Sequence, residues 1–398
     1  MVTIKFYKDP QRVGGGITEI NCDGKRLIID MGADMDKGFD YEEPNPDIDG
    51  LTLGDADVGA ILITHYHPDH IGLLKYALPG IPVYMSEATQ KVAMIMESGF
   101  APDEDNPTSY YAALQKTKII RFEDFGKPFS PCDGFEVVPL RVDHSAFDAM
   151  AYVVKVDGKK IFFTGDYRDH GYTGHKTKKL FKIYAADADV IITEGTQINR
   201  QSGSIVTEEN LKKRFIDICR QHKYVLYMGS STNLDSIISM ALATKKTGKC
   251  FGYIDGFSEQ MAGTLAGFAQ SKLYEEWQPV ERDAKNGRVV ICRMGSVNFI
   301  RRFFEKYGKD TVLVYSMWSG YIDQEPKLQE LEKELGDRFI RLHSSGHASR
   351  ELIQATLDIC GKAKVLPMHT ESFAEFHKIC RGNRVVELKA GEEYVAVR

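Results

Sequence analysis

The sequence predicts an α/β protein with covered sheets, divided into two domains. Three observations support this prediction. Short apolar, β-branched runs recur along the chain, amphipathic stretches separate them, and 398 residues exceed the length of a typical single domain. The composition, 43% hydrophobic and 27% charged, is typical of globular proteins and excludes a disordered or fibrous chain.

The elements can be expected from apolar periodicity and from the residues that begin and end each run. Thr207, followed by two glutamates, predicts a helix N-terminus, and Gly248 predicts the end of another helix. The expected strands are 60–63, 161–164, 189–193, 224–228, 249–254, 288–292 and 311–315. The expected helices begin at 70–74 and at 208, and a further one covers 234–246. Strands and helices that alternate in this way indicate βαβ units in both halves.

The polar stretch 201–204, which contains glycine and serine, suggests a domain boundary. We therefore expect a first domain at 1–204 and a second α/β domain at 205–342. The segment 343–398 has strand, helix and strand character but is too short to fold alone, so we expect it to complete the first domain.

Composition also limits the cellular setting. No apolar run approaches the roughly 20 residues of a membrane span, and the first 30 residues contain no secretory signal. The seven cysteines are odd in number and lack C-x-x-C spacing, which suits a reducing compartment. We expect a cytoplasmic protein without membrane contact. The net charge of −5 argues against a nucleic-acid binder that relies on overall positive charge, although a local positive site would still suffice.

The strongest chemical pattern lies directly after the strand at 60–63. It reads Thr-His-Tyr-His-Pro-Asp-His over residues 64–70. In an extended segment His65, His67 and Asp69 point to one side, and His70 enters from the next turn. Imidazole and carboxylate groups are ligands that zinc accepts readily. A polar surface loop is the alternative, but a loop has no physical need for four such groups at this spacing.

Three further candidate ligands end other segments: His144 in Val-Asp-His-Ser, Asp166 in Thr-Gly-Asp, and His369 in Pro-Met-His. Each alone is more often a cap or turn residue. Together with the cluster at 65–70 they make seven ligands, enough for two metal ions with positions open for water and substrate.

These motifs resemble the five-part pattern of the metallo-β-lactamase fold. The resemblance implies a four-layer αββα sandwich and a division of the ligands between two metals. By analogy, one metal would be held by His65, His67 and His144, the other by Asp69, His70 and His369, with Asp166 bridging them. Asp30, at the end of Leu-Ile-Ile-Asp, resembles the family's first motif and would support the ligands from behind.

A narrower resemblance is to the β-CASP nucleases, especially the ribonuclease J family. It rests on Glu194 in Thr-Glu-Gly-Thr, on His347 in Ser-Ser-Gly-His-Ala-Ser, and on the terminal Pro-Met-His. The second α/β domain falls where that family inserts its β-CASP domain. By analogy, Glu194 would hydrogen-bond a metal-bound histidine and His347 would contact a phosphate oxygen. The weaker candidates for substrate contacts are Ser230, Ser231, Ser345 and Gly346.

The resemblance implies a nuclease that uses two divalent metals to hydrolyse single-stranded nucleic acid. RNA is favoured as the substrate, DNA stays possible, and the sequence does not decide between them. In the expected mechanism Asp69 and Asp166 orient an activated hydroxide. Zinc follows from the nitrogen and oxygen ligands, and manganese is the alternative. Two other functions stay open: hydrolysis of a small ester, thioester or lactone, and a non-catalytic binding subunit. Internal or terminal cleavage, direction, physiological substrate and a homo-oligomeric state are not decided by the sequence.

Overall fold

A computed structural model describes residues 1–35, 42–98, 110–200, 203, 205–269, 284–382 and 384–396. The chain forms two compact units. The first contains 1–169, 173–204 and 346–398, and the second contains 170–172 and 205–345. Most of the stretch expected to separate the domains, namely Gln201, Ser202 and Ser204, lies outside the described residues.

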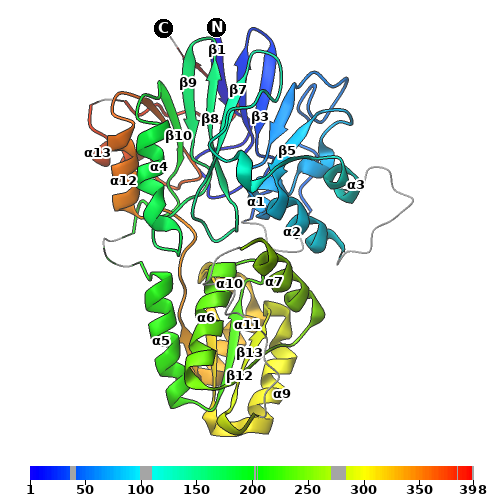
Figure 1. Cartoon of the computed structure of the whole chain (residues 1–398), viewed down its shortest axis with the longest axis vertical. Coiled ribbons are helices and arrows are strands. Elements are labelled where there is room, and N and C mark those ends of the chain that lie inside the picture. The colour runs from blue at the N-terminus through cyan, green and yellow to red at the C-terminus, as the bar shows by residue number, and fades with distance from the viewer. Residues whose placement is uncertain are drawn as a thin grey trace. The chain divides into compact units, whose positions relative to one another are not determined.

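Two β-sheets face each other in the first unit (Figure 1). Within the described residues the larger sheet has the order β17-β1-β2-β3-β4-β5-β6, and the smaller has β16-β10-β9-β8-β7. The strands of the larger sheet are β1 (Val2–Phe6), β2 (Thr18–Cys22), β3 (Lys25–Ile29), β4 (Ala60–Leu62), β5 (Val83–Ser86), β6 (Lys118–Ile120) and β17 (Glu393–Ala396). The strands of the smaller sheet are β7 (Glu136–Arg141), β8 (Met150–Val156), β9 (Lys159–Phe163), β10 (Val190–Glu194) and β16 (Lys364–Met368).

Alternating apolar residues close the space between these sheets. In β1, Val2, Ile4 and Phe6 are buried while the residues between them are partly exposed, so one face of the strand enters the core. Phe163 and Met368 enter the same core from the smaller sheet. Burial of such a side chain stabilises the fold by about 1.5–3 kcal/mol, and this layer therefore fixes the register of both sheets.

Helices cover the outer faces of both sheets. The helices on the larger sheet are α1 (Pro68–Ile71), α2 (Glu87–Ser98) and α3 (Tyr110–Gln115). Those beside the smaller sheet are α4 (Thr177–Tyr184), α12 (Arg350–Ile359) and α13 (Phe373–Ile379) (Figure 1). The ring of Phe162 in β9 packs edge-on against Phe181 of α4, with centroids 4.9 Å apart. The layers are helix, sheet, sheet and helix, which confirms the predicted αββα sandwich.

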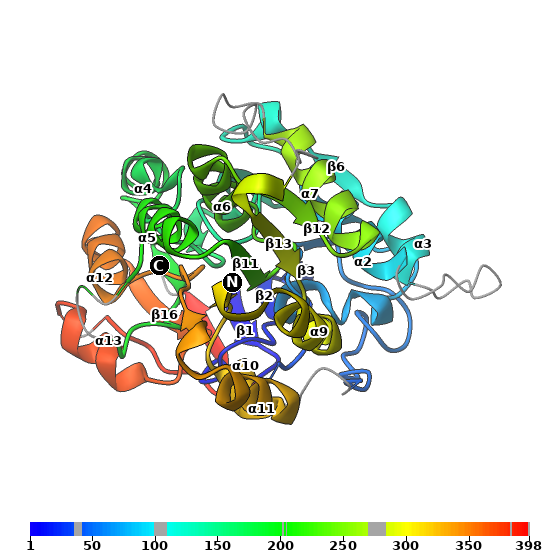
Figure 2. The ribbon, with the colours of Figure 1, turned by 90° about the horizontal axis from the view of Figure 1, so that it is seen from below.

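The second unit is built around one parallel sheet. Within the part that the structure describes, its strand order is β12-β13-β11-β14-β15. Its strands are β11 (Tyr224–Gly229), β12 (Cys250–Tyr253), β13 (Arg288–Cys292), β14 (Thr311–Ser316) and β15 (Phe339–Arg341). Its helices are α5 (Glu208–Gln221), α6 (Leu234–Thr247), α7 (Gly256–Phe268), α9 (Val297–Tyr307), α10 (Gly320–Gln324) and α11 (Pro326–Leu335). The first three pack on one face of the sheet and the last three on the other (Figure 2).

Helix ends in the second unit follow the expected chemistry. The Thr207 hydroxyl accepts a hydrogen bond from the Asn210 backbone nitrogen at 3.1 Å, so the predicted N-cap is confirmed. Gly248 adopts a left-handed φ of 66° behind α6, as the predicted stop requires. The sequence also predicted the strand at 288–292 with the observed bounds.

The expected helix at 70–74 is wrong in its position. The helix instead covers Pro68–Ile71, and a separate 3-10 turn follows at Leu74–Tyr76. The fixed φ of Pro68 suits the first helical position, so the helix begins before the residues chosen from apolar periodicity. None of the helices in the described part of the chain is long and apolar enough to cross a membrane.

Candidate metal centre

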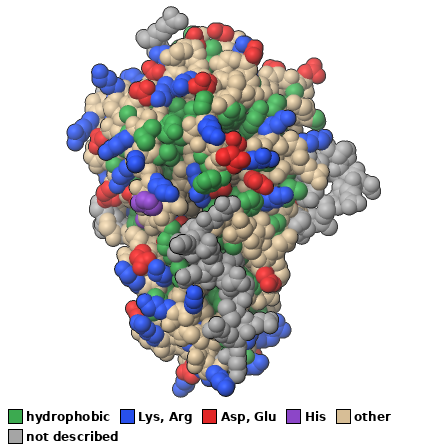
Figure 3. Space-filling model, in the orientation of Figure 1, with side chains coloured by type: hydrophobic (Ala, Val, Ile, Leu, Met, Phe, Trp, Pro, Cys, Tyr) green, Lys and Arg blue, Asp and Glu red, His purple; other side chains and the backbone are tan. Residues whose placement is uncertain are grey.

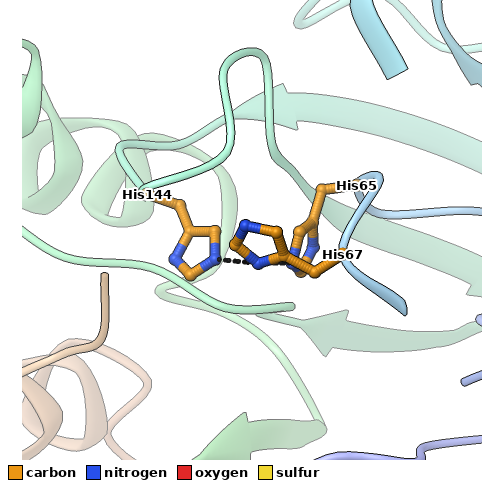
Figure 4. A group of neighbouring side chains, drawn as sticks. All are labelled: His65, His67 and His144. Carbon is orange, nitrogen blue, oxygen red and sulfur yellow. Dashed lines mark hydrogen bonds between the residues drawn. The ribbon is translucent and has the colours of Figure 1, made fainter. Parts of the chain in front are cut away.

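Three imidazoles meet at one point in the first unit (Figure 4). Nδ1 of His67 lies 3.0 Å from Nε2 of His65 and 3.2 Å from Nε2 of His144. Nδ1 carries at most one hydrogen, so it can donate to only one of these nitrogens. Nitrogens bound tetrahedrally to one zinc ion at about 2.0–2.1 Å lie roughly 3.3 Å apart, so the observed spacing fits a shared cation.

Backbone contacts after β4 place His65 and His67. The backbone nitrogen of Thr64 donates to Oδ1 of Asp30 at 2.7 Å, and the Thr64 carbonyl accepts from the Met150 nitrogen at 3.0 Å. His67 is still extended, with φ −66° and ψ 144°, and caps the helix that starts at Pro68. His65 and His67 are therefore two residues apart in an extended segment, which brings both rings to the same site.

A second group of ligand types lies beside the first. Nε2 of His369 is 3.1 Å from Oδ2 of Asp69, and Nε2 of His70 is 3.2 Å from Oδ2 of Asp166. The ligand atoms of these four residues all lie within 4.8 Å of one another. Asp166 also approaches the first group, because its Oδ2 is 3.9 Å from Nε2 of His144. The sequence prediction named these seven residues, and the structure brings them together.

Short helix α1 places Asp69 and His70. The position of α1 is fixed by residues 31–33, which follow β3. The backbone nitrogen of Met31 donates to the His70 carbonyl at 2.8 Å. Gly32 allows this close approach, since a Cβ at this position would lie 1.6 Å from the Asp69 carbonyl oxygen. A side chain at position 32 would therefore displace the helix and the two ligands that it carries.

The ring nitrogens that face away from the centre are held by neighbouring polar groups. Nδ1 of His70 lies 2.8 Å from Oδ2 of Asp30, and Nδ1 of His144 lies 2.7 Å from the Gly346 carbonyl oxygen. His65 Nδ1 contacts the Thr64 hydroxyl at 3.0 Å, and His369 Nδ1 contacts the Thr196 hydroxyl at 2.8 Å. A proton on Nδ1 leaves Nε2 with its lone pair toward the centre, which is the tautomer that a metal requires.

Asp30 and His369 both adopt left-handed backbone conformations. Their φ values are +63° and +50°. Such angles are uncommon for non-glycine residues and persist only where the surroundings hold them. At Asp30 the surroundings include three donors, because its carboxylate accepts from the backbone and hydroxyl of Thr64 and faces His70. Asp30 thus contacts His70, one of the candidate ligands, from the side away from the centre, and its role in supporting a metal ligand stays a prediction.

Glu194 lies next to the two ligand groups, at the end of β10, and is fully buried. Its Oε1 accepts hydrogen bonds from the backbone nitrogens of Tyr167 (3.0 Å) and Ala348 (3.2 Å). Its Oε2 faces Nδ1 of His347 at 3.0 Å. The sequence analysis expected Glu194 to contact a histidine among the seven ligands, whereas the histidine that it faces in the structure is His347. Glu194 therefore orients His347, whose Nδ1 is also 3.5 Å from Asp166.

Burial and charge set the protonation of the candidate ligands. Burial lowers the pKa of His67 to about 4, and it is also the largest cause that lowers the pKa of His65 and His144. These three imidazoles are neutral at pH 7, as metal ligation demands. Burial raises the pKa of Asp166, but the charges of His369 and His70 outweigh it and hold that pKa well below its usual range.

The residues present fit divalent cations. They offer imidazole nitrogens and carboxylate oxygens, and Oδ1 of Asp166 is buried with no hydrogen-bond partner among the described residues. A buried carboxylate oxygen without a partner is costly unless a cation or water satisfies it. The clusters of histidine and aspartate could therefore hold divalent metal.

The four weaker sequence candidates are divided between the two units. Gly346 belongs to the first unit, where its carbonyl holds His144. Ser230, Ser231 and Ser345 belong to the second unit. There the Ser231 hydroxyl pairs with Ser258 at 3.1 Å, and the Ser345 carbonyl lies 2.8 Å from Nε2 of His170.

Sequence reasoning missed two contributors to the site. Thr196 fixes His369, as described above, and Gly14, in the glycine run 14–16, lies against Asp69. Three consecutive glycines between two strands were a visible signal for a close backbone approach, which needs the absence of a side chain.

Comparison with known proteins agrees with the fold. Residues 26–222 match the family model described as the beta-lactamase superfamily domain. These residues form a domain of the beta-lactamase superfamily. A solved structure of a protein of unknown function from Enterococcus faecalis V583 superposes with a TM-score of 0.77 at 17% identity, covering 99% of each chain.

Curated relatives of this chain bear nuclease names. Ribonuclease J of Mycoplasma genitalium is 24% identical over 391 residues, which cover 91% of this chain and 66% of the relative. Endoribonuclease YSH1 of Mycosarcoma maydis is 28% identical over 209 residues, which cover 49% of this chain and 23% of the relative. The chain thus spans just under two thirds of the first relative. The resemblance to the β-CASP nucleases found in the sequence is confirmed by these names.

Proposed function

We propose that this protein is a metal-dependent hydrolase that cleaves phosphodiester bonds in RNA. The proposal includes two divalent ions, with zinc preferred over manganese because the ligands are mostly imidazoles. The single observation that carries it is the position of Asp166, whose carboxylate approaches His144 of the first ligand group and His70 of the second. The ribonuclease and endoribonuclease names of the relatives support RNA as the substrate.

The ligand groups would divide the two ions between them. His65, His67 and His144 would hold one, while Asp69, His70 and His369 would hold the other, with Asp166 shared. When bound, such ions lower the pKa of a coordinated water toward neutrality and polarise the phosphoryl oxygen. The carboxylates of Asp69 and Asp166 would accept hydrogen bonds from the attacking water and thereby orient it. Asp30 would keep His70 in the required tautomer.

His347 would act on the substrate phosphate. Burial lowers its pKa, but the negative charges of Glu194 and Asp166 outweigh this effect and raise the pKa to about 9. Its imidazole is then a charged donor at neutral pH, and Glu194 fixes its Nδ1. A charged donor placed beside the centre stabilises the negative charge that develops on a phosphate oxygen in the transition state.

Local positive charge at the site, rather than the net charge of the protein, would attract the RNA. The protein carries a net charge of −5, and on the face seen in Figure 3 Lys and Arg side chains are interspersed with Asp and Glu over both units. Bound divalent cations would supply the local positive charge. A cytoplasmic location, where RNA is abundant, agrees with the seven free cysteines.

The decisive experiment uses full-length protein with its metal content measured. End-labelled RNA and DNA oligomers are incubated with the protein, and the product ladder reveals the substrate and the site of cleavage. We expect cleavage of RNA, and a His347→Ala variant that keeps its metal but loses about 10²–10³-fold in rate, the usual cost of one transition-state donor. Intact oligomers with a fully loaded protein would contradict the proposal. Turnover of small esters without cleavage would instead support an ester hydrolase, and a purified protein that binds no metal would support a binding subunit.

A further inference from the structure

The loop between β1 and β2 forms a wall of the candidate metal centre. We call residues Arg12–Gly16 the glycine loop. Gly14 and Gly15 have left-handed φ values of +91° and +74°. A Cβ at Gly14 would lie 3.1 Å from Cβ and 3.3 Å from Oδ2 of Asp69. The backbone of the loop therefore lies directly against a candidate metal ligand, an approach that only glycine permits.

Three backbone amides of the glycine loop, those of Gly14, Gly15 and Gly16, have no acceptor among the described residues. Gly14 and Gly15 are also buried. Buried backbone N–H groups are nearly always paired, because leaving one unpaired costs as much as a lost hydrogen bond. A run of such amides suits an anion, which accepts several hydrogen bonds at once.

One pocket is lined both by the glycine loop and by residues of the candidate centre. Its lining includes Arg12, Gly14 and Gly16 of the loop, and also Asp30, His70 and His369. All six residues belong to the first unit. A group that enters this pocket can therefore contact the loop and the candidate ligands at the same time.

Arg12 is held at the edge of this pocket. Its Nη1 lies 3.2 Å from Oδ2 of Asp34, and the other oxygen of Asp34 is 2.7 Å from Nζ of Lys8. The side chain of Arg12 is 44% exposed, whereas that of Asp34 is only 12% exposed, so a buried carboxylate holds a partly exposed guanidinium. Asp9 also lines the pocket, but its Oδ1 accepts a hydrogen bond from the Gln11 nitrogen at 3.0 Å.

We propose that the glycine loop binds a phosphate group of single-stranded RNA, the one that neighbours the phosphate being cleaved. The backbone amides of the glycines and the guanidinium of Arg12 supply donors to its oxygens, and the contact sets the register of the strand on the centre. This inference rests on the proposed function and extends it by naming a second point of attachment for the substrate.

The test measures binding separately from cleavage. Metal-loaded, full-length protein is titrated into a fluorescein-labelled single-stranded RNA whose phosphorothioate linkages resist hydrolysis, at several salt concentrations. Two variants probe the pocket. Arg12→Gln removes the guanidinium, and Gly16→Val fills space, because a Cβ at Gly16 meets no atom within 4 Å and its φ is not left-handed. Arg121→Gln is the matched control, since Arg121 is an exposed arginine of the same unit that does not line the pocket.

Arg12→Gln is expected to weaken RNA binding about 10-fold. It should also reduce the salt slope, the change of log K with log salt concentration, by about 0.7, which is the contribution of one phosphate contact on a single strand. Gly16→Val should also weaken binding, with metal content and thermal stability unchanged. The control should match the native protein in both quantities. In cleavage assays both pocket variants should raise KM more than they lower kcat.

The inference is overturned if both pocket variants bind RNA within twofold of the native protein. It is also overturned if Arg12→Gln weakens binding without changing the salt slope, because the contact is then not to a phosphate. These outcomes are distinct from failure of the proposed function, in which native protein binds the oligomer but leaves unmodified RNA uncut.

Discussion

Replacing Glu194 by glutamine is expected to change the protonation of His347 while leaving the surrounding backbone in place. Oε1 of Glu194 accepts from the backbone nitrogens of Tyr167 and Ala348, and Oε2 faces His347. A glutamine keeps its carbonyl oxygen toward the two backbone donors, because the reverse orientation would bring its NH₂ group against both. Its amide nitrogen then points at Nδ1 of His347 and loses the long contact, 3.4 Å, to the Thr196 nitrogen.

The consequence is a neutral His347. Nδ1 must become an acceptor toward the new amide, so the remaining proton moves to Nε2. In the native site burial lowers the pKa of His347, but Glu194 and Asp166 raise it to about 9. Without the charge of Glu194, we expect the pKa to fall toward the ordinary value of about 6.5 or below it. In the metal-free protein the donor is therefore charged at pH 7.5, and in the metal-free variant it is neutral.

The magnitude follows from the strength of the donor. Complete removal of one transition-state donor costs about 10²–10³-fold in rate. A neutral donor is roughly half as strong as a charged one, so Glu194→Gln should lower kcat on RNA by about 10-fold. The rate of metal-loaded protein is compared with that of His347→Ala. When Glu194→Gln is added to the His347→Ala protein, the rate should change less than twofold, because that protein has no imidazole at position 347 whose charge could change.

A second readout does not depend on activity. Because bound cations would repel an imidazolium, the NMR titration of His347 is recorded on metal-depleted protein, where we expect a midpoint near 9 in the native chain and a lower one in the variant. The reasoning is refuted if Glu194→Gln leaves this midpoint unchanged. It is also refuted if the substitution slows the His347→Ala protein as much as it slows the native one.

Three further predictions concern the metal and the fold. Asp30→Asn should weaken metal affinity about 10–100-fold in a competition titration with a chelator, because His70 loses its charged partner; unchanged affinity would contradict this role. Asp143→Asn should lower the free energy of unfolding, measured in urea, by about 3–5 kcal/mol, because it removes the charge that faces the fully buried Arg168. The double variant Asp143→Leu, Arg168→Met should recover most of this loss. Adding zinc to metal-free protein at about 1,000 times its Kd should stabilise it by about 4 kcal/mol, seen as a higher Tm; an unchanged Tm would count against a metal site.

The sequence predicted the layered α/β fold and the seven candidate ligands for different reasons. The cluster at residues 65–70 is local, so extended geometry and ligand chemistry were enough to single it out. His144, Asp166 and His369 are distant in the chain and gained weight only beside that cluster and the family resemblance, because a single histidine or aspartate after a strand carries little information by itself. The structure shows the physical link for two of them: β9, which precedes Asp166, and β16, which precedes His369, both flank β10 in one sheet.

Other features depend on tertiary contacts that periodicity does not encode. The partner of Glu194 could not be inferred, because Ala348 and His347 approach it from more than 150 residues away. Helix α1 begins earlier than the apolar pattern predicted, because Pro68 is suited to the first helical position. The glycine loop was overlooked since glycine offers no side chain to interpret, although its backbone lies against Asp69.

The pairing of β16 with β10 has a consequence for how the protein is made. Met368 lies opposite Glu194 in this parallel pair, and His369 follows at once, while residues 205–345 of the second unit are encoded between the two strands. During synthesis the ribosome therefore releases six of the seven candidate ligands long before the last one. A product that terminates ahead of residue 364 would lack His369 and would also leave the edge of β10 open to pairing with other chains. Premature termination thus yields an inert, aggregation-prone fragment rather than an unregulated hydrolase.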